Sequence, residues 1–304
     1  MLPNKLLTIL IISVLSFTSC TLKETQAPPV VQPPVVQPPP KPAKIALVLG
    51  AGSSKGFAHI GVIKILESNK IPIHMIVGTS AGSVAGSLYA YGMGAFALQK
   101  LSFSVQKDDI IDLLYIPSNG FIKGEKLEEF INKTVNYTPM EKLKIPFYAV
   151  ATDLESGQEM VFGKGNTGTA VRASCSIPGI FRPVRISDRI YVDGGVVSPV
   201  AVDAAKRLGA DVVIAVDISS AVDRTQPEGT IDTILQSINI MYTKLGAIQV
   251  CKADVVIKPK VSHIGSADFS KRHEAILEGE KAAIEALPQI MKIITQLQQE
   301  KRLE

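Results

Sequence analysis

Histidine, cysteine and aromatic residues are all scarce in this chain of 304 residues, which has four histidines, three cysteines and 6% aromatic side chains. Three cysteines cannot form the framework of several disulfides that stabilises small secreted domains. The net charge is only +4 and the basic residues are scattered. The sequence therefore lacks the concentrated basic surface of a nucleic-acid-binding protein, and we expect no nucleic-acid partner.

Small and branched apolar residues are abundant instead. Hydrophobic residues make up 46% of the chain and charged residues only 20%, a composition that favours a large buried core over disorder. The globular part is predicted to be residues 44–304. Roughly 260 residues is an ordinary size for a single α/β enzyme domain with one sheet between helical layers.

The first 19 residues are typical of a secretory signal peptide. Lys5 precedes an apolar run, Leu6 to Phe17, that is shorter than the ~20 residues a membrane-spanning helix needs. Cys20 follows small residues and resembles the lipobox cysteine of bacterial lipoproteins, whose thiol is acylated. The alternatives are an ordinary signal peptide with an unrelated cysteine, or an uncleaved short anchor. Thr21, which is not acidic, favours the periplasmic face of the outer membrane.

Residues 20–43 are predicted to be a lipid-anchored tether. Pro28 to Pro42 repeats Pro-Pro-Val-Val-Gln, and proline favours an extended polyproline II conformation because it fixes φ and lacks an N–H group. At ~3.1 Å per residue such a spacer reaches roughly 45 Å.

A glycine-rich loop follows the first predicted strand of the domain. Ile45 to Leu49 is a continuous apolar run, and a helix is expected from Phe57 to Glu67. The loop between them consists of Gly50, Ala51, Gly52, Ser53, Ser54, Lys55 and Gly56. Strand, glycine loop and helix together direct backbone N–H groups at a bound anion.

The spacing within this loop suits an oxyanion better than a nucleotide. The dinucleotide fingerprint needs glycine where Lys55 stands, and the P-loop needs Gly-Lys-Ser/Thr in that order. We therefore predict a site for an oxyanion and no cofactor or metal. A plain glycine-rich turn is the alternative.

The next strand leads into a Gly-x-Ser-x-Gly sequence. Ile71 to Val77 is apolar, and a helix that ends near Tyr91 follows Gly78, Thr79, Ser80, Ala81 and Gly82. Such a strand–turn–helix holds a nucleophilic serine on a tight turn, and glycines let the strand and helix approach closely. Ser80 is therefore the predicted nucleophile. A tight turn with a structural serine is the alternative.

No histidine has a sequence context that marks it as the base of this serine. His263 and His273 follow Ser80 in the order expected of an α/β hydrolase, but their surroundings are typical of a loop and of a charged helix. His59 is close to the glycine loop, where a packing or capping role is expected.

An aspartate is the better candidate for the base. Arg189 to Val192 is a short predicted strand, and Asp193, Gly194 and Gly195 follow it. A carboxylate at a strand end before two glycines is held on a tight turn, although a surface β-turn has the same pattern.

The glycine loop, the Gly-x-Ser-x-Gly turn and Asp-Gly-Gly, in this order, resemble the patatin-like phospholipase family and its compact bacterial members. Residues 151–157, 172–179 and 208–217 resemble intervening family segments. The resemblance implies an α/β class, three-layer α/β/α fold with a mostly parallel sheet. It also implies a Ser80–Asp193 dyad, with the N–H groups of Gly50, Ala51 and Gly52 as the oxyanion hole, in a loop completed by Lys55 and Gly56.

The predicted function is hydrolysis of membrane-lipid esters, of phospholipase A or lysophospholipase type. The alternatives are a tethered envelope protein that binds lipid without turnover, and a Ser-His-Asp esterase that uses His263 or His273. A lid is expected within residues 107–118, and amphipathic core-covering helices over residues 231–248 and 272–298. Cys175 and Cys251 are expected to be buried thiols, with a disulfide between them as the alternative.

Overall fold

The computed structural model describes residues 40–114, 120–219 and 227–303. The predicted signal peptide, Cys20, most of the proline-rich tether and the end of the expected lid lie outside these residues. From residue 40 onward the chain is one compact unit. Within the described ranges, no helix combines the length and apolar character needed to cross a bilayer.

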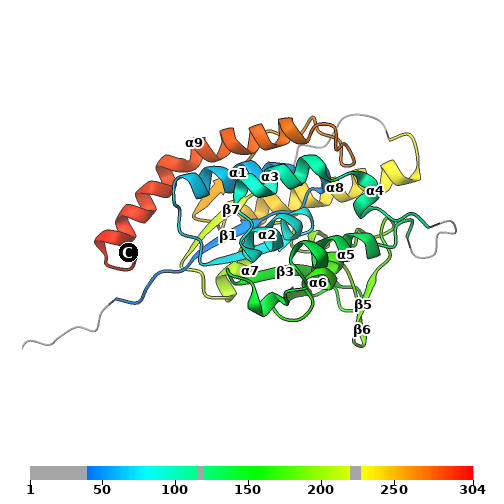
Figure 1. Cartoon of the computed structure of the whole chain (residues 1–304), viewed down its shortest axis with the longest axis horizontal. Coiled ribbons are helices and arrows are strands. Elements are labelled where there is room, and N and C mark those ends of the chain that lie inside the picture. The colour runs from blue at the N-terminus through cyan, green and yellow to red at the C-terminus, as the bar shows by residue number, and fades with distance from the viewer. Residues whose placement is uncertain (1–39, 115–119, 220–226, 304) are drawn as a thin grey trace, which may run out of the picture. The chain divides into compact units, whose positions relative to one another are not determined.

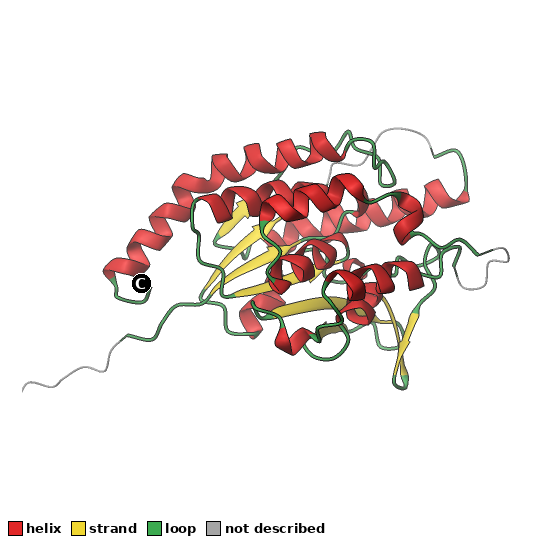
Figure 2. Cartoon of the chain, in the orientation of Figure 1, coloured by secondary structure: helices red, strands yellow, loops and turns green. Residues whose placement is uncertain are grey.

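A single sheet of eight strands organises this unit (Figure 2). The strands are β1 (Ile45–Leu49), β2 (Met75–Thr79), β3 (Phe147–Asp153), β4 (Glu159–Phe162), β5 (Val184–Ile186), β6 (Arg189–Asp193), β7 (Val212–Val216) and β8 (Val255–Ile257). Their hydrogen-bonded order is β5-β6-β3-β2-β1-β7-β8, and β4 also pairs with β3. The five strands β3, β2, β1, β7 and β8 are parallel, whereas β4, β5 and β6 pair antiparallel.

Helices surround the sheet (Figure 1). They are α1 (Phe57–Ser68), α2 (Ala81–Tyr91), α3 (Ala95–Ser104), α4 (Lys107–Ile110), α5 (Glu125–Thr134), α6 (Thr167–Ser174), α7 (Val202–Arg207), α8 (Thr230–Val250) and α9 (Arg272–Gln299). Short 3-10 turns lie at Ser53–Gly56, Met140–Lys142 and Gly194–Val196. The two long helices predicted after residue 217 are confirmed as α8 and α9.

The strand β1 is buried on both faces, as its continuous apolar sequence predicts. Ile45, Leu47 and Leu49 pack in a large cluster with α1, α2 and α9. Ala46 and Val48, on the other face, pack in a second cluster with α7. Helical layers therefore cover both faces of a mostly parallel sheet, which confirms the predicted three-layer α/β/α fold.

An unusual pairing on β3 brings two distant segments together. The strand β4 pairs with residues 149–152 along one edge of β3. On the opposite edge, β2 pairs with residues 147–150 and β6 pairs with residues 151–153. Running in opposite directions, β2 ends with Thr79 beside Val150 and β6 ends with Asp193 beside the next residue of β3. Ser80, which follows β2, is thereby brought to Asp193.

Candidate active site

Ser80 lies on the tight turn between β2 and α2. Its φ of 52° and ψ of −122° are a conformation that costs a non-glycine residue of order 1–3 kcal/mol. Neighbouring contacts maintain it: the Ser80 N–H donates to Ser174 Oγ at 2.9 Å, and Ser83 Oγ donates to the Ser80 carbonyl at 2.7 Å. The Ser80 side chain faces the cavity described below.

The glycines of this turn are required by close packing. A Cβ on Gly82 would lie 2.0 Å from the Leu49 carbonyl oxygen, and one on Gly78 would lie 2.6 Å from the Gly82 carbonyl oxygen. No real Cβ atom approaches backbone so closely, because these distances are well inside van der Waals contact. The helix α2 can therefore begin against the ends of β1 and β2 only with glycine at both positions.

Asp193 ends β6 and is fully buried. Its Oδ1 accepts a hydrogen bond from the Gly195 N–H at 2.7 Å, while Thr152 Oγ1 donates to its carbonyl at 2.9 Å. Burial raises the pKa of Asp193 to about 6, against the smaller lowering effects of the Ser80 hydroxyl, the Gly195 N–H and the Tyr242 hydroxyl. Within the described part of the chain, Oδ2 has no hydrogen-bond partner of good geometry.

Tyr242 is a site residue that sequence reasoning missed. It lies in the middle of α8, its side chain is buried, and a Cβ on Gly195 would lie 2.3 Å from its ring. Its hydroxyl and Asp193 Oδ2 are both buried atoms with no partner of good geometry among the described residues. Burial, then the Asp193 charge, raise the pKa of Tyr242 well above its ordinary value, so the phenol remains a neutral donor beside the carboxylate. Periodicity marks Tyr242 only as an inward-facing residue.

Two N–H groups of the predicted oxyanion hole are hydrogen-bonded within the fold. The Gly50 N–H donates to the Val216 carbonyl at 3.0 Å, and the Ala51 N–H donates to the Pro199 carbonyl at 2.8 Å. Both N–H groups therefore already have acceptors within the fold, and their role in an oxyanion hole stays a prediction. Sequence could not reveal this, because both acceptors come from segments about 150 residues away.

Two other N–H groups in the loop remain available. The described residues provide no hydrogen-bond acceptor to the N–H groups of Gly52 and Ser53. Ser53 has a φ of 53° and lines the same cavity as Ser80. Ser53 was not among the predicted oxyanion residues, since a serine within a glycine loop carries no distinctive signal.

The remaining loop residues have supporting contacts. Lys55 is buried, and its N–H donates to the Gly52 carbonyl at 3.2 Å. A Cβ on Gly56 would lie 2.6 Å from the Ala81 Cβ, so the loop packs against the start of α2. His59 Nε2 bonds to the Gly50 carbonyl oxygen at 2.8 Å. Burial lowers the pKa of His59 to about 4, so its ring is neutral at pH 7 and donates this hydrogen bond.

His263 and His273 are not arranged with Ser80 as a Ser-His-Asp site. His263 Nε2 lies 2.7 Å from a carboxylate oxygen of Glu274, and both side chains are partly exposed. His273 lies beside the Phe103 ring. Neither histidine lines the cavity that contains Ser80.

The two described cysteines are free thiols. Cys175 is buried, with its Sγ 3.7 Å from Ser83 Oγ, whereas Cys251 is exposed. The prediction of a buried thiol is therefore wrong for Cys251.

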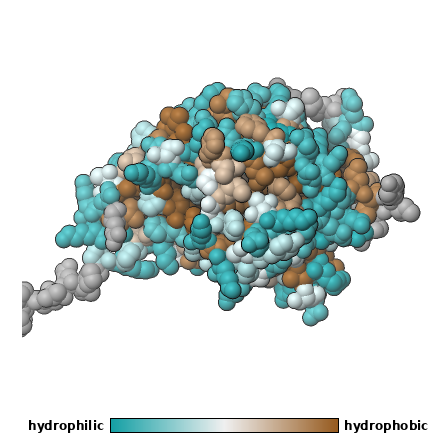
Figure 3. All heavy atoms as spheres, in the orientation of Figure 1, coloured by the Kyte–Doolittle hydropathy of each residue, from teal (hydrophilic) through white to brown (hydrophobic). Residues whose placement is uncertain are grey.

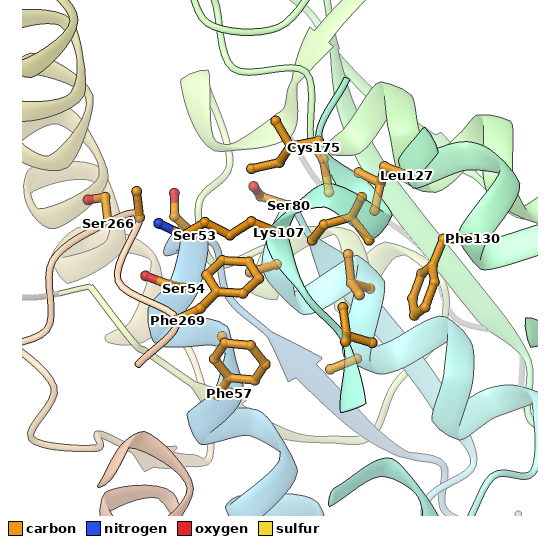
Figure 4. A pocket seen from close by; sticks show the side chains of 18 of the residues that line it. Ser53, Ser54, Phe57, Ser80, Lys107, Leu127, Phe130, Cys175, Ser266 and Phe269 are labelled. Atoms are coloured by element: carbon orange, nitrogen blue, oxygen red, sulfur yellow. The ribbon is translucent and has the colours of Figure 1, made fainter. Parts of the chain in front are cut away.

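A cavity of about 300 Å³ opens at Ser80 (Figure 4). Hydroxyl groups of Ser53, Ser54 and Ser266 lie on one side of Ser80, while Leu127 and Phe130 lie on the other. Most of the lining is apolar and comes from α1, α2, α3, α5 and the segment around Ile177. On the face seen in Figure 3, apolar residues form several patches between polar ones.

This arrangement is suited to a ligand with one long apolar part and one polar end. Ser80 and Ser53 line the cavity, and the buried carboxylate of Asp193 lies beside Ser80. No group of three or more histidine, cysteine, aspartate or glutamate residues in the described ranges is placed to hold a metal ion.

Known proteins share much of this sequence. An uncharacterized NTE family protein of Mycobacterium bovis is 35% identical over 181 residues, which cover 59% of this chain and 50% of the relative. A lysophospholipase NTE1 of Pyricularia oryzae is 27% identical over 279 residues, covering 81% of this chain and 18% of the relative. The aligned part is thus at most half the length of these two proteins.

Among solved structures, VipD from Legionella pneumophila aligns with a TM-score of 0.47 and 13% identity, covering 82% of this chain and 67% of the other. The sequence model of the patatin-like phospholipase family matches residues 47–206. This match spans more than half of the chain and includes the glycine loop, the serine turn and the Asp-Gly-Gly turn. The chain therefore belongs to the patatin-like phospholipase family.

Proposed function

We propose that this protein is a serine acyl hydrolase that cleaves ester bonds of membrane lipids, with Ser80 as nucleophile and Asp193 as its base. The observation that carries the proposal is that Ser80, which lines an apolar cavity, and the buried Asp193 carboxylate come together where β2 and β6 end beside neighbouring residues of β3. Family membership supports the same reaction class. The lysophospholipase name of one relative supports a phospholipase A or lysophospholipase type.

In the first step, Ser80 Oγ attacks the ester carbonyl carbon while its proton passes to Asp193 Oδ2. The carbonyl oxygen becomes an oxyanion, and the N–H groups of Gly52 and Ser53 stabilise it. Each such donor is worth ~2.7–4 kcal/mol in related acyl transfer. The alcohol then leaves with the proton from Asp193, and an acyl-serine remains. Water, deprotonated by Asp193, attacks this intermediate, and the fatty acid is released as Asp193 returns the proton to Ser80 Oγ.

Burial makes Asp193 a better base than an exposed carboxylate. An ordinary carboxylate accepts a proton from a serine poorly, because its pKa is ~3.9. Desolvation raises the pKa of Asp193 to about 6, which is still low enough for the carboxylate to be ionised at pH 7–8. The base is thus closer in pKa to the operating pH, as general-base catalysis favours. The Tyr242 hydroxyl lowers the pKa of Asp193 and so favours the ionised carboxylate.

The cavity selects an acyl chain. Its apolar lining shields a hydrocarbon from water at ~25 cal/mol per Å² of apolar surface, and Ser80 lies where the chain meets its ester. The structure thus supports long-chain lipid esters as substrates over small polar esters.

The sequence that precedes the described residues supports a proposal about location. We propose that Cys20 is acylated and that residues 20–43 tether the domain to an envelope membrane, which would place the cavity near phospholipid. Metabolic labelling with an alkyne palmitate should mark the wild-type protein and not a Cys20→Ser variant. Equal labelling of both proteins would refute the anchor.

The catalytic proposal is tested by comparing Ser80→Ala, Asp193→Asn and Ser87→Ala on a lysophospholipid. Ser87 is a buried serine of α2 that donates to the Val84 carbonyl and does not line the cavity, so it is the matched control. We expect the first two variants to lose at least ~10³-fold in kcat and the control to retain activity. Full activity in Asp193→Asn would refute the dyad.

Two further measurements separate the alternatives. A fluorophosphonate probe should label Ser80 in the folded protein. Lipid binding without labelling would favour a binding protein that lacks turnover. A double variant of His263 and His273 should keep its activity, and loss of turnover there would restore the Ser-His-Asp hypothesis.

A further inference from the structure

Lys107 is the single charged residue that lines the cavity at Ser80, among the residues that the structure describes. It begins the short helix α4, and its side chain runs across the serine-rich end of the cavity with its nitrogen toward Ser53 (Figure 4). Leu127 and Phe130 lie on the far side of Ser80. The cavity therefore has an apolar end and an end with one positive charge.

The charge of Lys107 is not neutralised within the described part of the chain. No described carboxylate oxygen lies within 4.0 Å of its ammonium. Its Nζ lies 5.8 Å from the centroid of the Phe269 ring, within the range of a cation–π contact. A nearby carboxylate, that of Asp268, accepts hydrogen bonds from the N–H and hydroxyl of Ser270 instead.

The position of the Lys107 ammonium relative to Ser80 determines which part of an ester substrate lies beside it. With the acyl chain among Leu127 and Phe130, the ester lies at Ser80 and its alcohol portion extends toward Ser53, Ser54 and Lys107. An ammonium at the mouth of an apolar cavity attracts an anion on that alcohol, because low-dielectric walls strengthen the interaction.

We infer that Lys107 binds the phosphate of a single-chain glycerophospholipid, so that the preferred substrates are lysophospholipids over uncharged acylglycerols. This inference rests on the proposed function of the Ser80 site. A lysine ammonium is an established phosphate-binding group. A volume of about 300 Å³ is at the lower limit of ligand pockets, which suits one acyl chain better than two.

The test compares a decanoyl lysophosphatidate with decanoyl monoacylglycerol, which have the same chain and differ in the phosphate. We expect wild type to have the higher kcat/KM for the lysophosphatidate. Lys107→Met should lower this value about tenfold, the effect of losing one favourable charged contact, and lower the value for the monoacylglycerol less than threefold. Lys107→Arg should restore the preference. The matched control is Lys100→Met, which removes an exposed charge from α3 outside the cavity.

Binding to inactive protein separates failure of this inference from failure of the proposed function. In Ser80→Ala protein, calorimetry should show that Lys107→Met raises the Kd for the lysophosphatidate about tenfold. If wild type cleaves neither lipid but this binding effect appears, the proposed function fails and phosphate recognition stands. Equal effects of Lys107→Met on both lipids, or an equal effect of Lys100→Met, would overturn the inference.

Discussion

Replacing Asp193 with asparagine should stabilise the folded protein at alkaline pH while it removes activity. The buried carboxylate has its pKa raised from 3.8 to about 6, so its ionised form is disfavoured in the folded state by about two pKa units. At ~1.36 kcal/mol per unit, this cost is about 3 kcal/mol. Asparagine is uncharged, has nearly the same shape and can still accept the hydrogen bond from the Gly195 N–H.

The sign of the effect follows from the raised pKa. Below pH 3.8 the carboxyl group is protonated in both the folded and unfolded states, so ionisation has no effect on stability. Between pH 3.8 and about 6 the unfolded chain loses its proton first, and the folded state becomes progressively less favoured. Above about pH 6 the full cost is present. His59, whose pKa is lowered to about 4, lowers stability in acid, but it does so in both proteins and cancels in their difference.

Urea unfolding at pH 8 and pH 4.5 measures this difference. We expect Asp193→Asn to raise the free energy of unfolding by about 3 kcal/mol at pH 8 and by much less at pH 4.5. The control is Asp153→Asn. The pKa of Asp153 is lowered by hydrogen bonds from the Ser156 N–H and Arg189, so this variant should be less stable than wild type at pH 8. If the Asp193→Asn protein is no more stable than wild type at pH 8, this account of the buried carboxylate is refuted.

Three further predictions concern catalysis and packing. The acidic limb of kcat/KM should have its midpoint near pH 6, because Asp193 must be ionised. Tyr242→Phe should move this midpoint upward by roughly one pH unit. A pH profile that does not move would assign Tyr242 a packing role alone. Gly82→Ala places a methyl group against the Leu49 carbonyl and should lower the free energy of unfolding by ~1–3 kcal/mol or more. The urea midpoint should fall and fluorophosphonate labelling should be lost. Labelling equal to that of wild type would contradict the close approach of α2 to β1. Leu127→Trp should reduce kcat/KM for long-chain p-nitrophenyl esters about tenfold more than for short-chain esters, because the larger side chain occupies space in the cavity. An equal loss of kcat/KM on both esters would exclude Leu127 from the acyl site.

The local elements of the site were predictable because each has a short-range cause. A continuous apolar run gave β1 its bounds, and Gly78, Ser80 and Gly82 predicted the turn before α2. The strand β2 begins at Met75, four residues later than the apolar run from Ile71. The reason is tertiary: the Ile71 N–H still bonds to the end of α1, and β2 begins only where its parallel partner β1 is available.

Long-range contacts decided the remainder. No pattern near Gly50 indicates that its N–H donates to Val216, and no pattern in α8 indicates that Tyr242 contacts Gly195. Lys107 likewise lines the cavity at Ser80 only because the fold brings α4 beside it. Each of these partners is separated by tens to more than a hundred residues, so the chain must fold before they meet.

The sequence alone therefore determined the fold class and the turns that contain Ser80 and Asp193, because strand periodicity and glycine turns are local properties of the chain. Only the tertiary structure decided which backbone N–H groups are available, how deeply Asp193 is buried and which charge faces the polar end of the cavity. The physical reason is that hydrogen-bond occupancy, desolvation and charge exposure depend on neighbours that the folding of the whole sheet and its helical layers brings together.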